Sequence, residues 1–201
     1  MKIIFDLDYT LLDTVRFKDA LADIFVQENF YADYKKYFKD QGINFDPREY
    51  LNILKDEGKI DSYAEKEIKS GLKELLGMMD NYLFRGVAKI LKKLKDGGAE
   101  LILLTFGNKE WHEDKIRTLS IGRYFTQIVF EEEDKAGSEY LRSLKNTEEE
   151  VLIVNDNAKE TEKMIKIIGE KAKVFLVDGP YVKNIKHNWP IHKLVELINY
   201  K

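Results

Sequence analysis

The first residues of the chain combine an apolar segment with side chains that could do chemistry. In the sequence MKIIFDLDYTLLDT, Asp6 and Asp8 stand two residues apart and Thr10 follows them. Two neighbouring carboxylates raise each other's pKa, and a bound divalent cation relieves this repulsion. An aspartate at the end of a strand is also a known type of covalent nucleophile. The segment therefore predicts metal-assisted chemistry on an anionic compound.

The elements that must position these residues are short strands. Five segments have a strand-like pattern, and most are nearly continuous apolar runs, as expected for parallel strands covered on both faces. These segments are residues 2–6, 100–105, 127–130, 151–154 and 173–177. Helices are expected between them, and a last helix should begin at Pro190, with an inner face formed by Ile191, Leu194, Val195 and Ile198. The alternation predicts an α/β fold with a doubly wound, parallel, five-stranded (Rossmann-like) sheet.

One connection is much longer than a crossover between parallel strands requires. About 70 residues lie between the first strand and the helix expected near Val87. Their apolar residues repeat at helical spacing, and Pro47 marks a break between helices. We expect a helical cap domain of residues 14–85, inserted into a core domain of residues 1–13 and 86–201. Most aromatic side chains of the insert are expected to pack in its own core.

The composition describes a globular protein and excludes several classes of function. Of the 201 residues, 44% are hydrophobic and 34% charged, with a formal net charge of -3. Acidic and basic residues are mixed along the chain, whereas a nucleic-acid partner would require a basic patch. No apolar run approaches the roughly 20 residues of a membrane span, and KIIF meets Asp6 too early for a signal peptide. Because a signal peptide and cysteine are both missing, we expect a cytoplasmic protein, and we expect no nucleic-acid or membrane partners. The three histidines, His112, His187 and His192, have no paired ligand spacing and are expected to be exposed.

Polar residues follow the expected strands. In chain order they are Asp6 and Asp8, then Thr105, Gly107 and Asn108, then Lys135, and then Asp156. Ligands of an open parallel sheet bind outside the carboxyl ends of its strands, so these groups should converge on one edge. Each residue alone has an ordinary structural explanation, since Asp156 could cap a helix and Lys135 lies in an acidic run typical of solvated surfaces. Their common order and placement favour a functional site.

Four motifs in this order resemble those of the haloacid dehalogenase superfamily, and the resemblance covers essentially the whole chain. The matching segments are residues 5–10, then Thr105 with Gly107 and Asn108, then Lys135, and then residues 151–156. The helical insert lies where that superfamily carries its α-helical cap. The resemblance implies a Mg²⁺-dependent phosphatase that hydrolyses a small phosphorylated metabolite through an aspartyl-phosphate.

The resemblance also implies roles for the acidic residues. Asp6 would be the nucleophile that attacks phosphorus. Asp8 would protonate the leaving oxygen and then activate water. Asp6, the main-chain carbonyl of Asp8 and Asp156 would hold Mg²⁺, a hard cation that prefers oxygen ligands.

Phosphate binding is assigned to the second and third motifs. Thr105 and Lys135 would neutralise the phosphoryl oxygens, and main-chain N–H groups around Gly107 and Asn108 would add donors. Ala136 follows Lys135 where the third motif usually has proline. Lys109 or Lys115 could therefore supply this charge instead.

The fourth motif departs from its usual pattern at one position, and two residues are candidates for its second acid. Asn155 precedes Asp156 where the motif usually has Gly or Ser. Either Glu160 or Glu162 could complete the motif, and Glu160 could bind the metal directly, bind it through water, or only orient the lysine. Thr10 is a further candidate for a supporting role at the metal.

Asp8 favours phosphate-ester hydrolysis over other reactions of the superfamily, because members that break carbon–halogen bonds lack this second aspartate. A phosphoryl-transferring mutase of the same fold would share the acids but commonly has valine where this chain has Thr10. A non-catalytic protein that binds a phosphorylated ligand would be expected to lack Asp6 or Asp8. Neither the physiological substrate nor the oligomeric state is indicated by the sequence.

Overall fold

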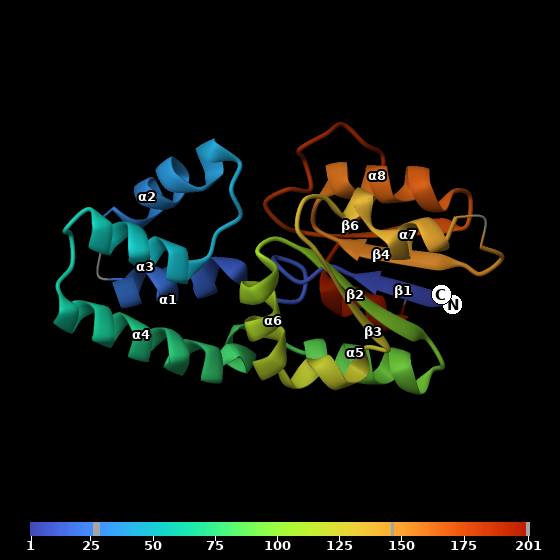
Figure 1. Cartoon of the computed structure of the whole chain (residues 1–201). Coiled ribbons are helices and arrows are strands. Elements are labelled where there is room, and N and C mark those ends of the chain that lie inside the picture. Colours follow the sequence, from blue (N-terminus) through green and yellow to red (C-terminus); the bar gives the residue numbers. More distant parts are fainter. Residues whose placement is uncertain (26–28, 146, 200–201) are drawn as a thin grey trace. The chain divides into compact units, whose positions relative to one another are not determined.

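The computed structural model describes residues 1–25, 29–145 and 147–199, and Figure 1 shows its helices and strands. The chain divides into two compact units. The sheet unit consists of Met1–Asp13, Leu83–Phe106 and Ser120–Lys201, and the helical unit of Thr14–Tyr82 and Gly107–Leu119. The predicted cap boundaries stay a prediction. The helical unit differs from them in ending at Tyr82 and in including the helix that follows the second strand.

The described residues of the sheet unit form one six-stranded sheet in the order β3-β2-β1-β4-β5-β6, in which every pair is parallel. The strands are β1 (Lys2–Phe5), β2 (Glu100–Phe106), β3 (Gln127–Glu131), β4 (Val151–Asn155), β5 (Ala172–Val177) and β6 (Ile191–His192). Chain order runs outward from β1 to β3 on one side and from β4 to β6 on the other. The order therefore reverses between β1 and β4, which is where such sheets bind ligands.

The predicted α/β fold with a doubly wound parallel sheet is confirmed, with one strand more than expected. The prediction of a helix beginning at Pro190 is wrong at its start, because Ile191–His192 pairs with the end of β5 as β6. The His192 carbonyl also accepts the N–H of Asp178 at 2.9 Å. A short apolar run is compatible with a strand or a helix, and the free edge of β5 decides between them here.

The end of the chain forms a 3-10 helix, η5 (Leu194–Asn199), in place of the expected α-helix. Leu194, predicted on the inner face, is buried together with Leu197, whereas Ile191 and Val195, also predicted there, are exposed. Burial three residues apart is the period of a 3-10 helix.

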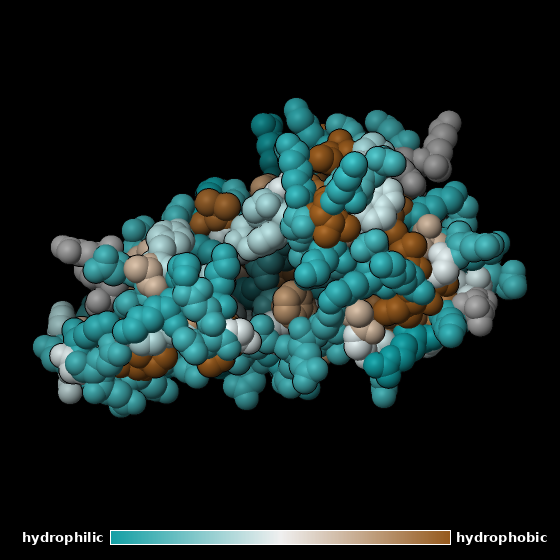
Figure 2. All heavy atoms as spheres, turned by 90° about the horizontal axis from the view of Figure 1, so that it is seen from above, coloured by the Kyte–Doolittle hydropathy of each residue, from teal (hydrophilic) through white to brown (hydrophobic). Residues whose placement is uncertain are grey.

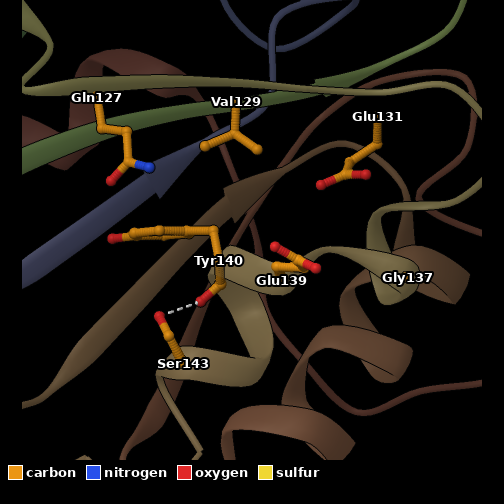
Figure 3. A pocket seen from close by; sticks show the side chains of 7 residues that line it. All are labelled: Gln127, Val129, Glu131, Gly137, Glu139, Tyr140 and Ser143. Carbon is orange, nitrogen blue, oxygen red and sulfur yellow. Dashed lines mark hydrogen bonds between the residues drawn. The ribbon is translucent and has the colours of Figure 1, made fainter.

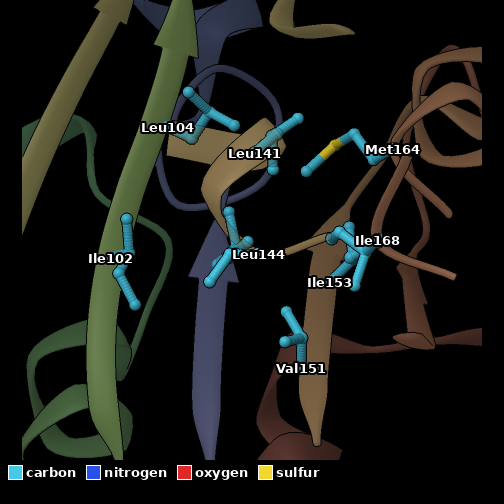
Figure 4. Packing of buried hydrophobic residues seen from close by; sticks show 9 residues of the cluster. Ile102, Leu104, Leu141, Leu144, Val151, Ile153, Met164 and Ile168 are labelled. Atoms are coloured by element: carbon cyan, nitrogen blue, oxygen red, sulfur yellow. The ribbon is translucent and has the colours of Figure 1, made fainter. Parts of the chain in front are cut away.

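Helices cover both faces of the sheet (Figure 1). On one face, α7 (Glu139–Ser143) and α8 (Ala158–Ile168) pack against alternate residues of β2 and β4. Figure 4 shows Ile102 and Ile153 from these strands beside Leu141 and Met164 from the helices. The other face is covered by α5 (Val87–Asp96), whose Gly97–Gly98 end agrees with the predicted stop. Burial on both faces explains why the strands are continuous apolar runs.

The helical unit contains five α-helices in its described residues. They are α1 (Thr14–Phe25), α2 (Phe30–Tyr37), α3 (Pro47–Asp56), α4 (Ser62–Gly77) and α6 (Lys109–Thr118). Asp46 begins α3 by accepting the N–H of Arg48, and Pro47 occupies the first helical turn, as its fixed φ allows. Asp61 caps α4 in the same way through the N–H of Ala64.

Aromatic side chains form the core of the helical unit, as predicted. The rings of Phe25 and Tyr50 lie 4.8 Å apart, and those of Phe38 and Phe45 lie 5.0 Å apart. Phe30 contacts the Tyr50 ring edge-on at 5.6 Å. Such edge-on and tilted pairs are the arrangements that aromatic rings prefer.

Helix α6 belongs to the helical unit because its side chains pack there. Trp111 stacks on Phe17 of α1 with ring centroids 6.0 Å apart. Arg48 of α3 reaches Asp114 at 3.3 Å and Glu110 at 3.6 Å. The chain therefore passes from the sheet unit into the helical unit directly after β2.

The surface seen in Figure 2 is covered mainly by hydrophilic residues, with hydrophobic residues in small groups between them. Among the described residues, no helix is both long enough and apolar enough to cross a membrane.

Candidate active site

The turn after β1 presents Asp6 and Asp8 at the carboxyl end of that strand. Asp6 continues the strand pairing, since its N–H donates to the Val154 carbonyl at 3.0 Å. The chain then turns tightly, because the Leu7 carbonyl accepts three N–H groups from the residues that follow. Tyr9 has a φ of 60°, in the left-handed region that residues other than glycine seldom adopt. The turn keeps both aspartates beside the strand end, with Asp6 buried and Asp8 half-buried.

Lys135 lies against Asp6, although 129 residues separate them in the sequence. Its Nζ donates to Asp6 Oδ1 at 2.7 Å and lies 2.9 Å from Glu160 Oε2, and the side chain is only 2% exposed. Burial lowers a lysine pKa, but the charges and hydrogen bonds of Asp6 and Glu160 outweigh it and raise the pKa of Lys135. Asp134 shapes the turn that carries the lysine by accepting the N–H of Ala136 at 2.9 Å. The lysine is therefore charged and fixed beside Asp6.

Glu160, and not Glu162, lies beside Lys135. It stands in the first turn of α8, where Asn157 caps the helix by accepting the Glu160 N–H at 3.1 Å. Its Oε1 accepts from the Asn157 side-chain amide at 3.2 Å, and its Oε2 from that of Asn155 at 3.4 Å. Glu162 instead pairs with a lysine one turn further along the same helix. With both its oxygens engaged, Glu160 is placed to orient the lysine.

Asp156 follows β4 and is almost completely buried. Its N–H donates to Thr10 Oγ1 at 3.1 Å, which joins the fourth predicted motif to the first. Its Oδ2 is buried and has no hydrogen-bond partner among the described residues. Burial raises the pKa of Asp156 to about 8, helped by the charge of Asp6. Burial also raises the pKa of Asp6 to about 6, against the opposing effect of Lys135.

The donor set fits a hard cation such as Mg²⁺. Asp6 and Asp156 disfavour each other's charge, and the unpartnered Oδ2 of Asp156 is a buried acceptor, which a bound cation would satisfy. The predicted ligands are these two carboxylates and the main-chain carbonyl of Asp8. Within the described part of the chain, no three acidic or histidine side chains are gathered as a metal cluster. A set of two carboxylates and a carbonyl does not require one.

The residues of the second motif divide between the two units. Thr105 is buried on β2 and lies opposite Phe130 of β3. Gly107 and Asn108 belong to the helical unit, where Asn108 caps α6 by accepting the N–H of Trp111 at 2.9 Å. The structure thus brings Asp6, Asp8, Thr10, Lys135, Asp156 and Glu160 together in the sheet unit. It places Thr105 on the neighbouring strand and the other two residues directly after it in the chain.

Two features of the site were not found from the sequence. The prediction of exposed histidines is wrong, because His112 is buried and His187 and His192 are half-buried. The His112 ring lies against Gly107, where a Cβ would come within 2.5 Å of His112 Nε2. Gly179 lies against Asp156, where a Cβ would come within 2.7 Å of the aspartate Cβ. The sequence Asp178-Gly179-Pro180 after the fifth strand is typical of a turn. It could have indicated that Gly179 lies in a turn near the ends of the strands.

The raised pKa of Asp156 gives a pH-dependent stability in the metal-free protein. Because its pKa rises from 3.8 to about 8 on folding, the folded state holds the proton more tightly than the unfolded chain. This contribution is present in full below about pH 4 and is lost as the pH rises through about 8.

We therefore expect Asp156→Asn, which cannot ionise, to lose less stability between about pH 5 and pH 8 than the unchanged protein. Thermal unfolding in EDTA measures the difference, which should be several degrees, since 1 kcal/mol shifts the midpoint by about 2–4 °C at this chain length. If the melting temperatures of the two proteins fell equally with rising pH, the assigned burial of the Asp156 carboxylate would be contradicted.

A separate hollow lies on the sheet unit between β3 and α7 (Figure 3). Its volume is about 640 Å³, and it is lined by Gln127, Val129, Glu131, Gly137, Glu139, Tyr140 and Ser143. None of the predicted site residues is among them. The hollow is therefore distinct from the candidate active site.

The sheet and its strand-end groups define an α/β protein with an acidic, lysine-containing site where the strand order reverses. A family model of the haloacid dehalogenase-like hydrolases matches residues 3–174. The chain belongs to this family of hydrolases. The comparison with curated proteins found no match.

Solved structures share the fold over nearly the whole chain. A candidate haloacid dehalogenase-like hydrolase from Burkholderia xenovorans has a TM-score of 0.75 at 15% identity, covering 100% of this chain and 98% of its own. A candidate β-phosphoglucomutase from Thermotoga maritima has a TM-score of 0.62 at 21% identity, covering 98% and 96%. A candidate hydrolase of the same family from Bacillus subtilis, bound to magnesium, has a TM-score of 0.59 at 15% identity, covering 98% and 96%. At these identities the likeness concerns the fold alone.

Proposed function

We propose that the protein is a Mg²⁺-dependent phosphatase that hydrolyses a small phosphorylated metabolite through an aspartyl-phosphate at Asp6. The observation that carries this proposal is the buried cluster of Asp6, Lys135 and Asp156 at the carboxyl ends of the strands. Membership of a hydrolase family supports it, and so does the magnesium bound to the Bacillus subtilis structure of the same fold.

The first chemical step uses the two aspartates after β1. An Asp6 carboxylate oxygen attacks phosphorus, and the bond from phosphorus to the substrate oxygen breaks. Asp8 gives its proton to that leaving oxygen. Lys135, already 2.7 Å from Asp6 Oδ1, places a positive charge where the phosphoryl oxygens arrive. Thr105 and the main-chain N–H groups around Gly107 and Asn108 are proposed as the remaining phosphate donors.

In the second step Asp8, now ionised, takes a proton from water as the water attacks phosphorus. The bond to Asp6 breaks, and inorganic phosphate leaves. When bound by Asp6, Asp156 and the Asp8 carbonyl, Mg²⁺ neutralises phosphoryl charge and so reduces its repulsion of the nucleophile. Thr10 holds the main chain of Asp156, and Glu160 holds Lys135.

Two residues favour hydrolysis of a phosphate ester over related reactions. Asp8 supplies the acid that an alkoxide leaving group requires and that a halide does not. Thr10 accepts a buried hydrogen bond from Asp156, which the valine common in mutases could not accept. The helical unit is proposed as the cap that governs access to the site and selects the substrate. The cytoplasmic location stays a prediction.

The purified protein with Mg²⁺ should release inorganic phosphate from p-nitrophenyl phosphate and from part of a panel of sugar phosphates, nucleotides and small phospho-acids. EDTA should abolish the release, and added Mg²⁺ should restore it. Absence of hydrolysis on every compound would overturn the proposal. Transfer of phosphate between positions of one sugar, without release of inorganic phosphate, would identify a mutase instead.

A further inference from the structure

The connection between β5 and β6 runs over the fourth motif, in a part of the chain where the sequence indicated no function. We call residues 178–184 of it the β5–β6 connection. Three of its residues, Gly179, Tyr181 and Asn184, contact the residues that carry or flank the candidate metal ligands. These contacts all lie within the sheet unit.

Gly179 limits the space on one side of the Asp156 side chain. A Cβ at this position would lie 2.7 Å from Asp156 Cβ and 2.9 Å from its Oδ2, closer than real Cβ atoms approach. The φ of Gly179 lies outside the left-handed range, so lack of space, and not backbone conformation, requires glycine here. Thr10 fixes Asp156 from its main chain through the 3.1 Å hydrogen bond. Asp156 is thus fixed at its main chain by Thr10 and confined at its side chain by Gly179, while its Oδ2 has no partner among the described residues.

Tyr181 supports the turn that contains Asp8. Its ring meets the ring of Tyr9 edge-on, with centroids 5.5 Å apart and planes at 82°. Tyr9 has the left-handed φ of 60°, a conformation that persists only where its surroundings hold it. Because Tyr9 directly follows Asp8, fixing this residue also fixes the Asp8 carbonyl.

Asn184 ties the same connection to the start of α8. Its side-chain amide donates to Asn157 Oδ1 at 2.8 Å, and its own Oδ1 accepts the Lys159 N–H at 3.1 Å. Asn157 directly follows Asp156 in the chain and is the N-cap of α8. The Tyr181 carbonyl also accepts the N–H of Ala158 at 3.4 Å.

We propose that the β5–β6 connection is a positioning element of the candidate metal site: Gly179 sets the Asp156 carboxylate, and Tyr181 sets the Asp8 carbonyl through Tyr9. This inference rests on the proposed function, because it takes these two groups as Mg²⁺ ligands. Supporting residues around a metal commonly change its affinity about 10- to 100-fold when altered.

The first test is Mg²⁺ affinity, measured by calorimetry on the full chain without substrate. Gly179→Ala should raise the Kd about 10- to 100-fold, because the added methyl group displaces Asp156. Gly77→Ala is the matched control: it adds the same methyl group at the end of α4, where nothing lies within 4 Å, and should leave the Kd unchanged. An unchanged Kd in Gly179→Ala would overturn the role of this glycine.

The second test uses Tyr181, which is 39% exposed and can be truncated without opening the core. Tyr181→Ala should raise the Kd for Mg²⁺ several-fold, and Tyr181→Phe should keep it within about twofold, because phenylalanine keeps the ring that meets Tyr9 edge-on. Equal affinities for the alanine variant and the unchanged protein would overturn the role of Tyr181. Melting temperatures of all variants in EDTA establish that each is folded.

The outcomes separate this inference from the proposed function. If the unchanged protein binds no Mg²⁺ and hydrolyses no phosphate ester, the proposed function fails and the inference fails with it. If the unchanged protein binds Mg²⁺ and turns over, but Gly179→Ala and Tyr181→Ala bind Mg²⁺ equally well, only the positioning role fails.

Discussion

Asp6→Asn should hydrolyse p-nitrophenyl phosphate at least about 10³-fold more slowly than the unchanged protein, as expected for the loss of a covalent nucleophile. The amide has the shape of the carboxylate, and its oxygen can still accept the hydrogen bond from Lys135. It cannot attack phosphorus, because its oxygen carries no negative charge. The fold should be retained, since Lys135 keeps its 2.9 Å ion pair with Glu160.

Initial rates with Mg²⁺ and thermal unfolding in EDTA measure the two parts of this prediction. Asp96→Asn provides the control, because it makes the same change at an exposed position in α5 of the same unit. That variant should keep the full rate. Beryllofluoride, which mimics an aspartyl-phosphate, should bind the unchanged protein and not Asp6→Asn.

The two aspartates can be told apart by the intermediate. In Asp8→Asn the phosphoryl group should still pass from p-nitrophenyl phosphate to Asp6, because nitrophenolate leaves without a proton. Hydrolysis should then stall for lack of a base. Mass spectrometry of acid-quenched protein should therefore detect phosphate on Asp6 in Asp8→Asn and none in Asp6→Asn. Full turnover by Asp6→Asn would remove Asp6 as the nucleophile.

The sheet could be predicted because burial on both faces leaves a direct trace in the sequence. Residues 2–5, 100–106 and 151–155 are nearly unbroken apolar runs, and a parallel sheet covered by helices requires them. The strand β6 could not be predicted, because two residues are too few to show the alternation of apolar and polar side chains that indicates a strand. Ile191–His192 becomes a strand only where β5 offers a free edge. Its assignment therefore depends on tertiary structure and not on local pattern.

The site was predictable as a set of strand ends, but not in its supporting contacts. Strand order alone brings Asp6, Lys135 and Asp156 to one edge. Glu160 and Glu162 lie two residues apart on α8 and therefore point to different faces of the helix. The sequence does not show which of these faces is turned toward Lys135. Gly179 was not predicted either, because a close approach between segments 23 residues apart in the chain gives no periodic signal.

The second large effect is expected for Lys135→Met, which should lose both hydrolysis and stability. Methionine keeps an unbranched side chain of similar length but leaves the buried Asp6 and the half-buried Glu160 without their cation. Removing one partner of a buried ion pair costs about 3–5 kcal/mol. Loss of the charge beside the phosphoryl oxygens should slow hydrolysis by about 10²- to 10³-fold, as for other donors of this kind.

The stability deficit of Lys135→Met should grow with pH. Burial already raises the pKa of Asp6 to about 6 in the presence of Lys135, and removing the lysine raises it further. A carboxyl group with a raised pKa contributes stability at low pH that is lost as the pH rises through that value. Thermal unfolding in EDTA should therefore show a larger difference from the unchanged protein at about pH 8 than at about pH 5.

Two other lysines provide the comparison for activity. Lys109 is exposed on α6, and Lys115 is buried on the same helix. If Lys135 is the phosphate-binding lysine, Lys109→Met should keep its rate. Loss of hydrolysis in Lys115→Met, with hydrolysis retained in Lys135→Met, would transfer the role to Lys115.

A double variant separates the two effects of Lys135. Adding Glu160→Gln to Lys135→Met removes one of the uncompensated carboxylates, while the glutamine oxygen can still accept one of the two hydrogen bonds that Asn155 and Asn157 donate to Glu160. The double variant should therefore regain part of the lost stability at about pH 8. Together with Glu160→Gln alone, the two variants complete a double-mutant cycle that gives the coupling energy of the pair. It should regain no hydrolysis, because no cation returns to the position beside Asp6. Recovery of the rate together with the stability would mean that Lys135 acts only by holding the fold, and its assignment to the phosphoryl group would then be wrong.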